Sequence, residues 1–367
     1  MLYLQYLCGK KPTLKDMTTD ERYMMRCIEL AQCGMKNAQP NPMVGAVVVC
    51  DGRIIGEGYH VRCGEGHAEV NALASVRDED VPLLGRSTIY VSLEPCAHYG
   101  KTPPCAELII KKGLKRVVVG CVDPFAKVQG RGIEMIKEAG IEVTVGVLEK
   151  ECIELNKRFM TFHGKGRPMV TLKWAQSSDG YIGAAEGEPR AIISNSMTTM
   201  VCHKRRAEHQ AIMVGRRTAL LDDPSLSVRE WTGDSPVRIV IDRMNSLPRT
   251  LRLFDGSVPT IVIADLNSEA GSETDGVEIV RVDFAESVIA QTMKELHARG
   301  LQTLLVEGGR ELLQSFIDED MWDEAYVETS PCVMGGGTPA PMLKNAEKVG
   351  EKEWFGHKIV EYMPKMP

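Results

Sequence analysis

The sequence lacks several features that mark large classes of proteins. It has no excess of basic residues, because 44 Lys and Arg stand against 50 Asp and Glu, which gives a net charge of −6. Nucleic-acid binding needs clustered positive charge. The apolar stretch at residues 1–7 is too short to cross a membrane. We therefore expect neither nucleic acid nor a membrane as the main partner, although a few local cations could still hold a small phosphorylated substrate.

Further patterns are missing. The 11 cysteines are odd in number and follow no regular spacing, unlike those of disulfide-stabilised secreted domains. No small-residue cleavage site follows the apolar start, so we interpret residues 1–17 as a loose N-terminal extension. These absences predict a reducing, cytoplasmic location. The Gly-x-Gly-x-x-Gly pattern of the usual dinucleotide-binding fold is also absent from the second half of the chain.

What the chain does contain is a pattern of metal ligands. A His-x-Glu motif begins at His67, and two Pro-Cys dipeptides follow at Cys96 and Cys105. One histidine and two cysteines leave the fourth tetrahedral position of a zinc ion open, as in catalytic sites. Glu69 does not share a helix face with His67, so we expect it beside the metal as a proton carrier. This is the chemistry of the zinc deaminases.

The spacing of the cysteines departs from the common form of that motif. Nucleoside and nucleic-acid deaminases use Cys-x-x-Cys, whereas Cys96 and Cys105 lie nine positions apart, with His98 and Lys101 between them. A deaminase of free nucleosides, bases or tRNA is therefore disfavoured. A structural zinc module would need four Cys or His ligands and no nearby carboxylate. The alternative is two unrelated buried cysteines and a surface histidine, which would be the better interpretation for a lone cysteine. The upstream His-x-Glu and the Pro-Cys at both cysteines favour a catalytic zinc site.

The length of 367 residues favours two domains. In the first, a helix is predicted from Thr18 or Thr19, followed by a hairpin of strands at 44–49 and 53–59. Strands at 88–93, 116–120 and 141–145 alternate with helices at 67–75, 104–113, 132–140 and 148–162. This order predicts an α/β sheet with the metal ligands where strands give way to helices.

A short basic segment at 163–168 is the predicted joint, after which the pattern restarts. Strands at 169–175, 211–215, 237–242, 260–264 and 303–309, with helices at 196–208 and 286–299, predict a second α/β domain. Its glycines at 308–309 precede a helix and could face a phosphate, but a simple turn is the better reading. Composition and spacing alone thus predict a zinc deaminase joined to an α/β domain of unknown use.

Several motifs together resemble those of one family. They are Pro40-Asn41-Pro42-x-Val44-Gly45, Gly58-Tyr59-His60, His67-Ala68-Glu69, Leu93-Glu94-Pro95-Cys96-x-His98, Gly100-Lys101-Thr102-Pro103-Pro104-Cys105, Lys173-x-Ala175-x-Ser177-x-Asp179-Gly180, Leu221-Asp222-Asp223-Pro224-x-Leu226, Arg238-Ile239-Val240-Ile241-Asp242 and Val306-Glu307-Gly308-Gly309. The chain resembles the bifunctional deaminase–reductases of riboflavin biosynthesis over roughly residues 18–367. The long cysteine spacing is the most specific of these features.

The resemblance implies an architecture and two reactions. Residues 18–165 would form a cytidine-deaminase-like three-layer domain, and residues 166–367 a dihydrofolate-reductase-like α/β domain. The first would use zinc to deaminate 2,5-diamino-6-(phosphoribosylamino)pyrimidin-4-one by hydrolysis. The second would use NADPH to reduce the ribosyl side chain to the ribityl phosphate. Family membership also implies a homo-oligomer. A second domain that has lost catalysis and only supports assembly stays open as an alternative.

The resemblance also implies roles for individual residues. His67, Cys96 and Cys105 would bind zinc, Glu69 would move the proton, and Asn41 would contact the pyrimidine, with His60, His98 and Lys101 as weaker candidates. The implied cofactor contacts are Ala175, Ile192, Thr218, Asp222, Arg243 and Gly309, and the implied substrate contacts are Arg190, Arg206, Leu226, Arg229 and Glu307. Relatives carry Trp-Ile-Thr/Ser where this chain has Ile192-Ile193-Ser194, so an aromatic cofactor contact is expected to be lost. Lys173 and Asp179 are either site residues or a structural pair.

Overall fold

The structure is a computed structural model that describes residues 16–35, 37–99, 103–125, 128–185, 187–188, 191–269 and 275–365. Within this part, the chain divides into two compact units, one ending at Gly166 and the next beginning at Arg167. Each unit has its own sheet. We call them the first and second unit and describe each by itself.

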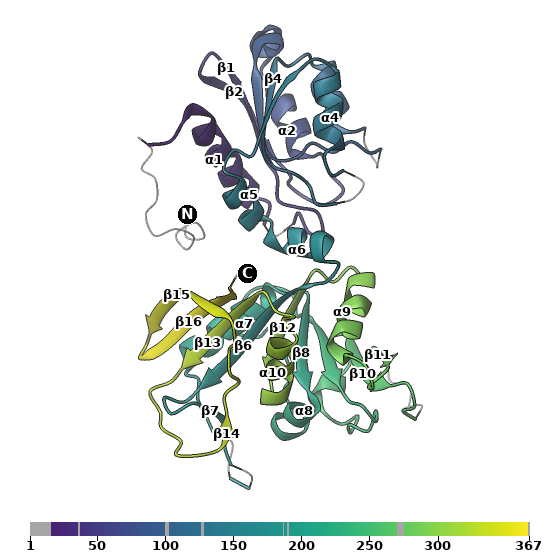
Figure 1. Ribbon diagram of the computed structural model, residues 1–367, viewed down its shortest axis with the longest axis vertical. Helices are drawn as coiled ribbons and strands as arrows, with labels where there is room; N and C mark the ends of the chain where they lie inside the picture. The colour runs from purple at the N-terminus through teal and green to yellow at the C-terminus, as the bar shows by residue number, and fades with distance from the viewer. Residues whose placement is uncertain are drawn as a thin grey trace. The chain divides into compact units, whose positions relative to one another are not determined.

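The described part of the first unit contains a five-stranded sheet with the order β2-β1-β3-β4-β5 (Figure 1). Its strands are β1 (Gly45–Cys50), β2 (Arg53–Tyr59), β3 (Thr88–Leu93), β4 (Arg116–Cys121) and β5 (Glu142–Val145). β1 is antiparallel to both of its neighbours, whereas β3, β4 and β5 run parallel. The predicted hairpin is confirmed, and the predicted strand at 88–93 coincides with β3.

Helices cover both faces of this sheet. They are α1 (Thr19–Gln32), α2 (Ala68–Ala74), the 3-10 helix η2 (Asp78–Arg86), α3 (Cys105–Lys111), α4 (Arg131–Glu138), α5 (Glu149–Leu155) and α6 (Lys157–Lys165). Apolar side chains of α2, α3 and α4 form one core with the sheet, while α1 and α5 lie on the opposite face (Figure 1). Thr18 and Glu21 form a reciprocal capping box that begins α1. The unit is thus the three-layer α/β/α arrangement that was predicted.

The single helix predicted at 148–162 is wrong. The chain instead forms α5 and α6, which meet at Asn156. The Asn156 side chain accepts from the Met43 backbone N–H and donates to the Met43 carbonyl, both at 2.8 Å. This long-range pairing breaks the helix. α6 also extends to Lys165, inside the predicted joint, and Gly166 ends it with a left-handed φ of 63°.

The second unit is built on a nine-stranded sheet in the order β11-β10-β9-β8-β12-β6-β13-β16-β15. Its described strands are β6 (Met169–Gln176), β8 (Ala211–Gly215), β9 (Val237–Ile241), β10 (Thr260–Asp265), β11 (Val277–Val282), β12 (Thr303–Gly308), β13 (Glu324–Thr329), β15 (Ala346–Trp354) and β16 (His357–Pro364). The strands from β11 to β13 are parallel, and β16 and β15 complete the sheet antiparallel. β7 (Tyr181–Gly183) and β14 (Thr338–Pro339) form a separate ribbon.

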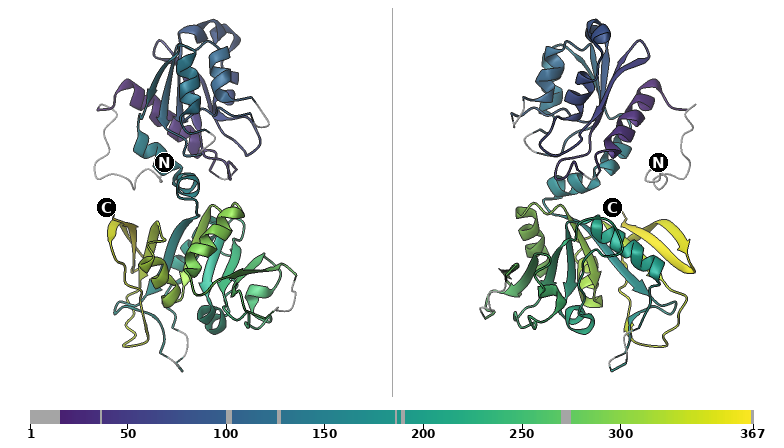
Figure 2. Two further views of the ribbon diagram at one scale, coloured as in Figure 1. Left: turned by 45° about the vertical axis from the view of Figure 1, so that its right-hand side comes forward. Right: turned by 180° about the vertical axis from the view of Figure 1, so that it is seen from behind.

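Helices of the described residues cover both faces of this sheet. α9 (Val288–Ala298) and α10 (Arg310–Asp318) pack on one face, where Phe316 and Trp322 are buried in an apolar core. α7 (Ser196–Ala207) and α8 (Arg216–Asp222) lie on the other face, together with the 3-10 helix η3 (Arg252–Phe254). The right-hand view of Figure 2, taken from behind, shows α7 lying across that face. The five strands predicted for this half are confirmed, but β11, β13, β15 and β16 had not been predicted.

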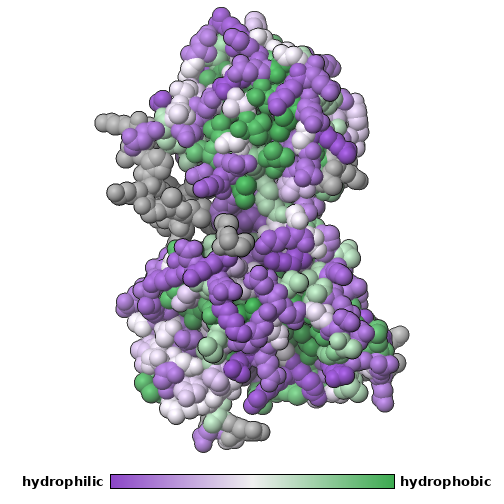
Figure 3. Space-filling model, in the orientation of Figure 1, coloured by the Kyte–Doolittle hydropathy of each residue, from purple (hydrophilic) through white to green (hydrophobic). Residues whose placement is uncertain are grey.

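The surface is a mixture of hydrophilic and apolar side chains, as Figure 3 shows for one face. Apolar atoms ordinarily contribute more than half of a folded protein's surface. None of the helices in the described residues has the length and apolar character that crossing a bilayer requires.

Candidate functional sites

Three elements of the first unit place the predicted metal ligands at the carboxyl end of β3. His67 is the residue that precedes α2, Cys96 follows β3, and Cys105 is the first residue of α3. The Nδ1 atom of His67 lies 3.5 Å from Cys96 Sγ and 3.4 Å from Cys105 Sγ. The three donor atoms all lie within 4.8 Å of one another. The structure therefore brings the sequence-predicted ligands together.

These atoms fit a zinc ion. Zinc bonds of about 2.3 Å to sulfur and 2.0–2.1 Å to nitrogen, at tetrahedral angles, place sulfur and nitrogen roughly 3.5 Å apart. The observed separations agree with that value. The Cys105 thiol, together with the backbone N–H of Cys105 and the His67 ring, lowers the pKa of Cys96 to about 4. Cys96 thus favours the thiolate form that binds metals.

Glu69 lies beside this group without being part of it. It stands in the first turn of α2, is 3% exposed, and its carboxyl contacts the Cys105 thiol. Burial raises the pKa of Glu69 to about 7, and the nearby Cys96 adds to the effect. A carboxyl group with such a pKa can hold and release a proton near neutral pH.

Asn41 and His60 lie beside the metal-ligand group and contact each other. Asn41 Nδ2 lies 3.1 Å from His60 Nε2, and His60 Nδ1 lies 3.2 Å from the Gly66 carbonyl. The Gly66 carbonyl needs a donor, so Nδ1 carries the proton and Nε2 accepts from Asn41. Burial lowers the pKa of His60, in keeping with this neutral ring. The His60 and His67 rings meet edge to face at 5.5 Å, which brings Asn41 into the ligand group's surroundings.

The loop between the two cysteines is only partly described. His98 is exposed and its ring lies 6.1 Å from that of Phe125. Phe125 in turn meets the ring of His163, on α6, at 5.0 Å. Lys101 lies outside the described residues. The structure thus gives His98 an aromatic neighbour.

In the second unit, the residues expected to face the substrate form one cluster. Arg206, on α7, donates to Glu307 through Nε at 2.9 Å and through Nη2 at 2.7 Å. Its Nη1 also donates to the Ser227 carbonyl at 3.2 Å. Arg229 donates to the Ser227 hydroxyl at 3.0 Å, and Leu226, next to Ser227 in the chain, is buried. Arg190 lies outside the described residues.

The residues of this cluster differ in how fully they are paired. Burial opposes the charge of Glu307, but Arg206 outweighs it and lowers the pKa of Glu307 to about 2. Arg206 and Glu307 therefore form a bidentate, fully ionised pair. Arg229 is held by the hydroxyls of Ser225 and Ser227. Hydroxyl partners leave its positive charge in place for an anionic group.

Two of the candidate cofactor residues, Thr218 and Gly309, are in contact. A Cβ atom added to Gly309 would lie 3.0 Å from Thr218 Oγ1, so the ends of β12 and the start of α8 meet. Ala175 lies at the carboxyl end of β6, and Asp222 is the last residue of α8. Arg243 follows β9 and pairs with Asp265 at 3.1 Å. Ala175, Arg243 and Gly309 lie at or just after the carboxyl ends of parallel strands, the usual ligand-binding edge of such sheets.

Comparisons with known proteins find a known kind of domain in each half of the chain. The pattern that defines the RibD C-terminal domain matches residues 168–355, and that of the cytidine and deoxycytidylate deaminase zinc-binding region matches residues 17–121. Riboflavin biosynthesis protein RibD of Aquifex aeolicus is 40% identical over 87% of this chain and 88% of its own length. RibD of Bacillus amyloliquefaciens is 39% identical over 89% and 88%, respectively. The chain belongs to the RibD family.

A solved structure supports the same conclusion for the fold. The diaminohydroxyphosphoribosylaminopyrimidine deaminase/5-amino-6-(5-phosphoribosylamino)uracil reductase of Thermotoga maritima is 36% identical, with a TM-score of 0.81 over 94% of this chain and 98% of its own. The predicted pairing of a cytidine-deaminase-like unit with a reductase unit is confirmed. RibD proteins are enzymes of riboflavin biosynthesis that combine a deaminase and a reductase, and zinc and NADPH, the predicted cofactors, are those of the family.

The structure describes the residues at the position where an aromatic cofactor contact was expected to be lost. Ile192, at the position of the expected aromatic contact, is 88% exposed. Ser194, two residues on, instead points inward and donates to Glu328 at 2.9 Å. In the described part of this loop, the inward contact toward the sheet is therefore made by a hydroxyl rather than a ring.

Residues that the sequence reasoning did not assign also shape the RibD sites. The Glu94 carboxylate, directly before the Pro95-Cys96 ligand segment, accepts from the backbone N–H groups of Gly130 at 2.9 Å and Gly132 at 3.0 Å. A Cβ atom on Gly132 would lie 1.9 Å from the Pro95 carbonyl oxygen. The start of α4 is thus fixed against the ligand segment. The only signal for this was the glutamate within the Leu-Glu-Pro-Cys motif.

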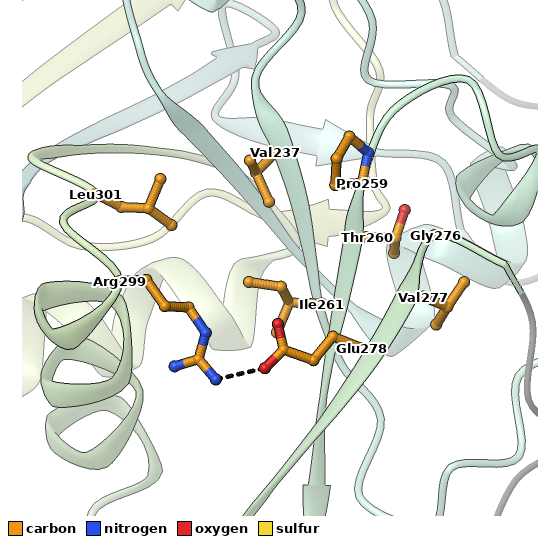
Figure 4. Close-up of a pocket in the computed structure, with 9 residues that line it drawn as sticks. All are labelled: Val237, Pro259, Thr260, Ile261, Gly276, Val277, Glu278, Arg299 and Leu301. Atoms are coloured by element: carbon orange, nitrogen blue, oxygen red, sulfur yellow. Dashed lines mark hydrogen bonds and ion pairs between the residues drawn. The ribbon is translucent and has the colours of Figure 1, made fainter.

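A cavity of about 410 Å³ lies elsewhere in the second unit (Figure 4). It is lined by Val237, Pro259, Thr260, Ile261, Gly276, Val277, Glu278, Arg299 and Leu301. These residues stand at the amino ends of β9, β10 and β11, opposite to the edge that carries the candidate cofactor residues. Arg299 is paired with Glu278 and Glu295 at the rim. The cavity therefore does not belong to either RibD site.

Proposed function

We propose that the chain catalyses two reactions on a phosphorylated pyrimidine. The first is hydrolytic deamination of 2,5-diamino-6-(phosphoribosylamino)pyrimidin-4-one. The second is NADPH-dependent reduction of the ribosyl side chain of the deaminated product to the ribityl phosphate. We assign the first to residues 18–165 and the second to residues 166–367. The observation that carries this proposal is the group of donor atoms of His67, Cys96 and Cys105 beside the buried Glu69. Homo-oligomeric assembly and a cytoplasmic location stay predictions from the sequence.

The first unit's own residues divide the work of deamination. His67, Cys96 and Cys105 would hold a zinc ion, which supplies the Lewis acidity that activates water in deaminases of this kind. Water oxygen replaces the ring amino group, and ammonia leaves. Glu69 accepts a proton from that water at its carboxylate and delivers it to the departing nitrogen. Asn41, oriented by His60, is placed to hydrogen-bond the pyrimidine edge.

The second unit's residues bind and orient the product of the first reaction. NADPH would supply a hydride to C1′ of the ribosyl group, while the bond from C1′ to the ring oxygen opens and that oxygen takes up a proton, which gives the ribityl chain. Glu307 holds Arg206 in one bidentate orientation, so the guanidinium presents its remaining edge in a fixed direction. Arg229, held by hydroxyl groups, supplies positive charge for the phosphate. Thr218 and Gly309 meet at the strand edge where the cofactor is expected.

The proposal is tested on the intact protein by removing the metal with a strong chelator. Ammonia release reports deamination, and the absorbance of NADPH reports reduction of substrate that is already deaminated. Deamination should disappear and return with added zinc, while NADPH oxidation stays nearly unchanged, because the ligands belong to the first unit alone. Loss of both activities on chelation, with recovery of both by zinc, would show that this division of labour is wrong.

A cysteine variant repeats the test without a chelator. Cys105→Ser should lose zinc and deamination together, because two ligands hold the ion poorly. Cys33→Ser is the matched control, since Cys33 is an exposed cysteine at the end of α1. It should keep both zinc and activity. Full deamination by the Cys105→Ser protein after dialysis against chelator would contradict the assignment.

A further inference from the structure

One face of the second unit's sheet carries charged groups beneath α7. Glu328 lies opposite Ala175 in the register of β13 and β6, and Ile359 of β16 lies opposite Glu328. Paired residues point to the same side of a sheet, as do residues two positions apart along a strand. Lys173, Glu328 and His357 therefore share one face. A cavity of about 20 Å³ between these groups and α7 is lined by Lys173 and Glu328 among others.

Glu328 is the centre of this group. Its side chain is 4% exposed. Its Oε1 pairs with His357 Nδ1 at 2.9 Å, and its Oε2 accepts from the Ser194 hydroxyl at 2.9 Å. Oε2 also lies 3.8 Å from Lys173 Nζ. A buried carboxylate is costly unless it is paired and hydrogen-bonded, and these contacts from separate segments meet that requirement.

One partner of Glu328, Lys173, also interacts with the substrate cluster, the group formed by Arg206, Glu307, Leu226 and Arg229. Burial opposes the charge of Lys173, but Cys202, Glu307 and Glu328 outweigh it, so the pKa of Lys173 is raised. Lys173 is thus an ammonium group that pairs with Glu328 and also interacts electrostatically with Arg206 and Glu307. The charged and titratable groups around it are Cys202, Arg205 and Arg206 on α7, Glu307 on β12, Tyr326 and Glu328 on β13, and His357 and Glu361 on β16.

Ser194 links Glu328 to the helix as well. It precedes Asn195, whose side chain accepts from the N–H groups of Met197 and Thr198 and so begins α7. α7 carries Arg206. The Glu328 carboxylate therefore ties the start of α7 and the ammonium group of Lys173 to one point of the sheet.

We propose that Glu328 is a positioning residue for the reductase reaction: oriented by His357, its carboxylate holds the Lys173 ammonium group and the Ser194 segment in the arrangement that the substrate cluster requires. This rests on the proposed function of the second unit. Glu328 acts through Lys173 and α7, and it is not assigned a contact with the substrate. Neither Glu328 nor His357 belongs to the set implied by the resemblance.

The test replaces Glu328 by an amide of the same shape. In Glu328→Gln, the kcat for NADPH-dependent reduction should fall by roughly tenfold or more, the scale seen when a supporting partner of a site residue is removed. Deamination should not change. The Lys173 ammonium group, followed by NMR with labelled lysine and assigned with Lys173→Arg, should titrate at lower pH, because a negative charge beside it is gone. Glu353→Gln, at an exposed glutamate of β15 outside this group, is the control and should shift neither quantity.

Two His357 variants separate positioning from mere stability. Asparagine can place an amide N–H near the position of Nδ1, whereas leucine cannot. His357→Asn should therefore keep a kcat close to that of the wild type, and His357→Leu should lose several-fold. If Glu328→Gln does not fold, this pair carries the test, and equal losses in the two variants overturn the proposal.

The remaining outcomes are distinct. An unchanged kcat together with an unchanged Lys173 titration in Glu328→Gln overturns the proposal. If the wild-type protein does not reduce the deaminated substrate with NADPH, the proposed function of the second unit fails. In that case the Lys173 titration still decides whether Glu328 holds the ammonium group, since it does not depend on turnover.

Discussion

Replacement of Glu69 by glutamine is the sharpest test of the deaminase site. Glu69 is buried in the first turn of α2 and contacts Cys105 without being one of the donor atoms. Glutamine keeps its shape but cannot carry a proton from water to the leaving amine. Loss of general acid–base catalysis costs about 10²–10⁴ in rate. At 1.36 kcal/mol per tenfold, this is about 2.7–5.4 kcal/mol of barrier.

The assay measures zinc content and ammonia release on the same protein. Glu69→Gln should keep about one zinc ion per chain, because three ligands remain, and should lose at least about a hundredfold in kcat. Glu65→Gln, an exposed glutamate just before α2, should match the wild type in both. Loss of zinc from Glu69→Gln, or a rate within a few-fold of the wild type, would refute the reasoning.

Other predictions concern stability and cofactor choice. Gly132→Ala should destabilise the first unit by about 3 kcal/mol or more, because the new Cβ meets the Pro95 carbonyl. Gly164→Ala in α6 is the control and should be neutral or stabilising, because nothing lies within 4 Å of its added Cβ. Thermal unfolding measures the stability of both variants. Arg116 lowers the pKa of Asp20, so their interaction stabilises the fold above the unfolded pKa of about 3.9 and is lost as the pH falls through the folded pKa. Asp20→Asn should cost about 1–2 kcal/mol at pH 7, and the difference should vanish in denaturant titrations at acid pH. The reductase should oxidise NADPH faster than NADH at matched concentrations; equal rates would contradict this.

Local signals made much of the first unit predictable. The strand at 88–93 and the capping box at Thr18 need only neighbouring residues, and His67, Cys96 and Cys105 carry their chemistry in their side-chain types. The break at Asn156 was missed because its cause is Met43, far along the chain. Periodicity alone favours one continuous helix there.

The second unit shows more clearly which features cannot be predicted from local sequence. Its candidate residues, such as Arg206 and Glu307, entered through resemblance, because a charged residue on a helix and another at a strand end give no hint of their bidentate contact. Glu328 and His357 lie on strands that were not predicted at all. Their pairing depends on β16 lying beside β13, which is a property of the whole sheet.

The position of β6 has a consequence for how the chain is made. β6 lies between β12 and β13 in the sheet, yet a ribosome must translate to residue 329 before both neighbours exist. β1 and β2, by contrast, pair as soon as the short turn between them emerges. A pause in translation between residues 176 and 303 would leave a finished first unit attached to an apolar strand with open edges, the kind of nascent segment that recruits chaperones or aggregates. On each newly made chain, deamination should therefore become available before reduction does.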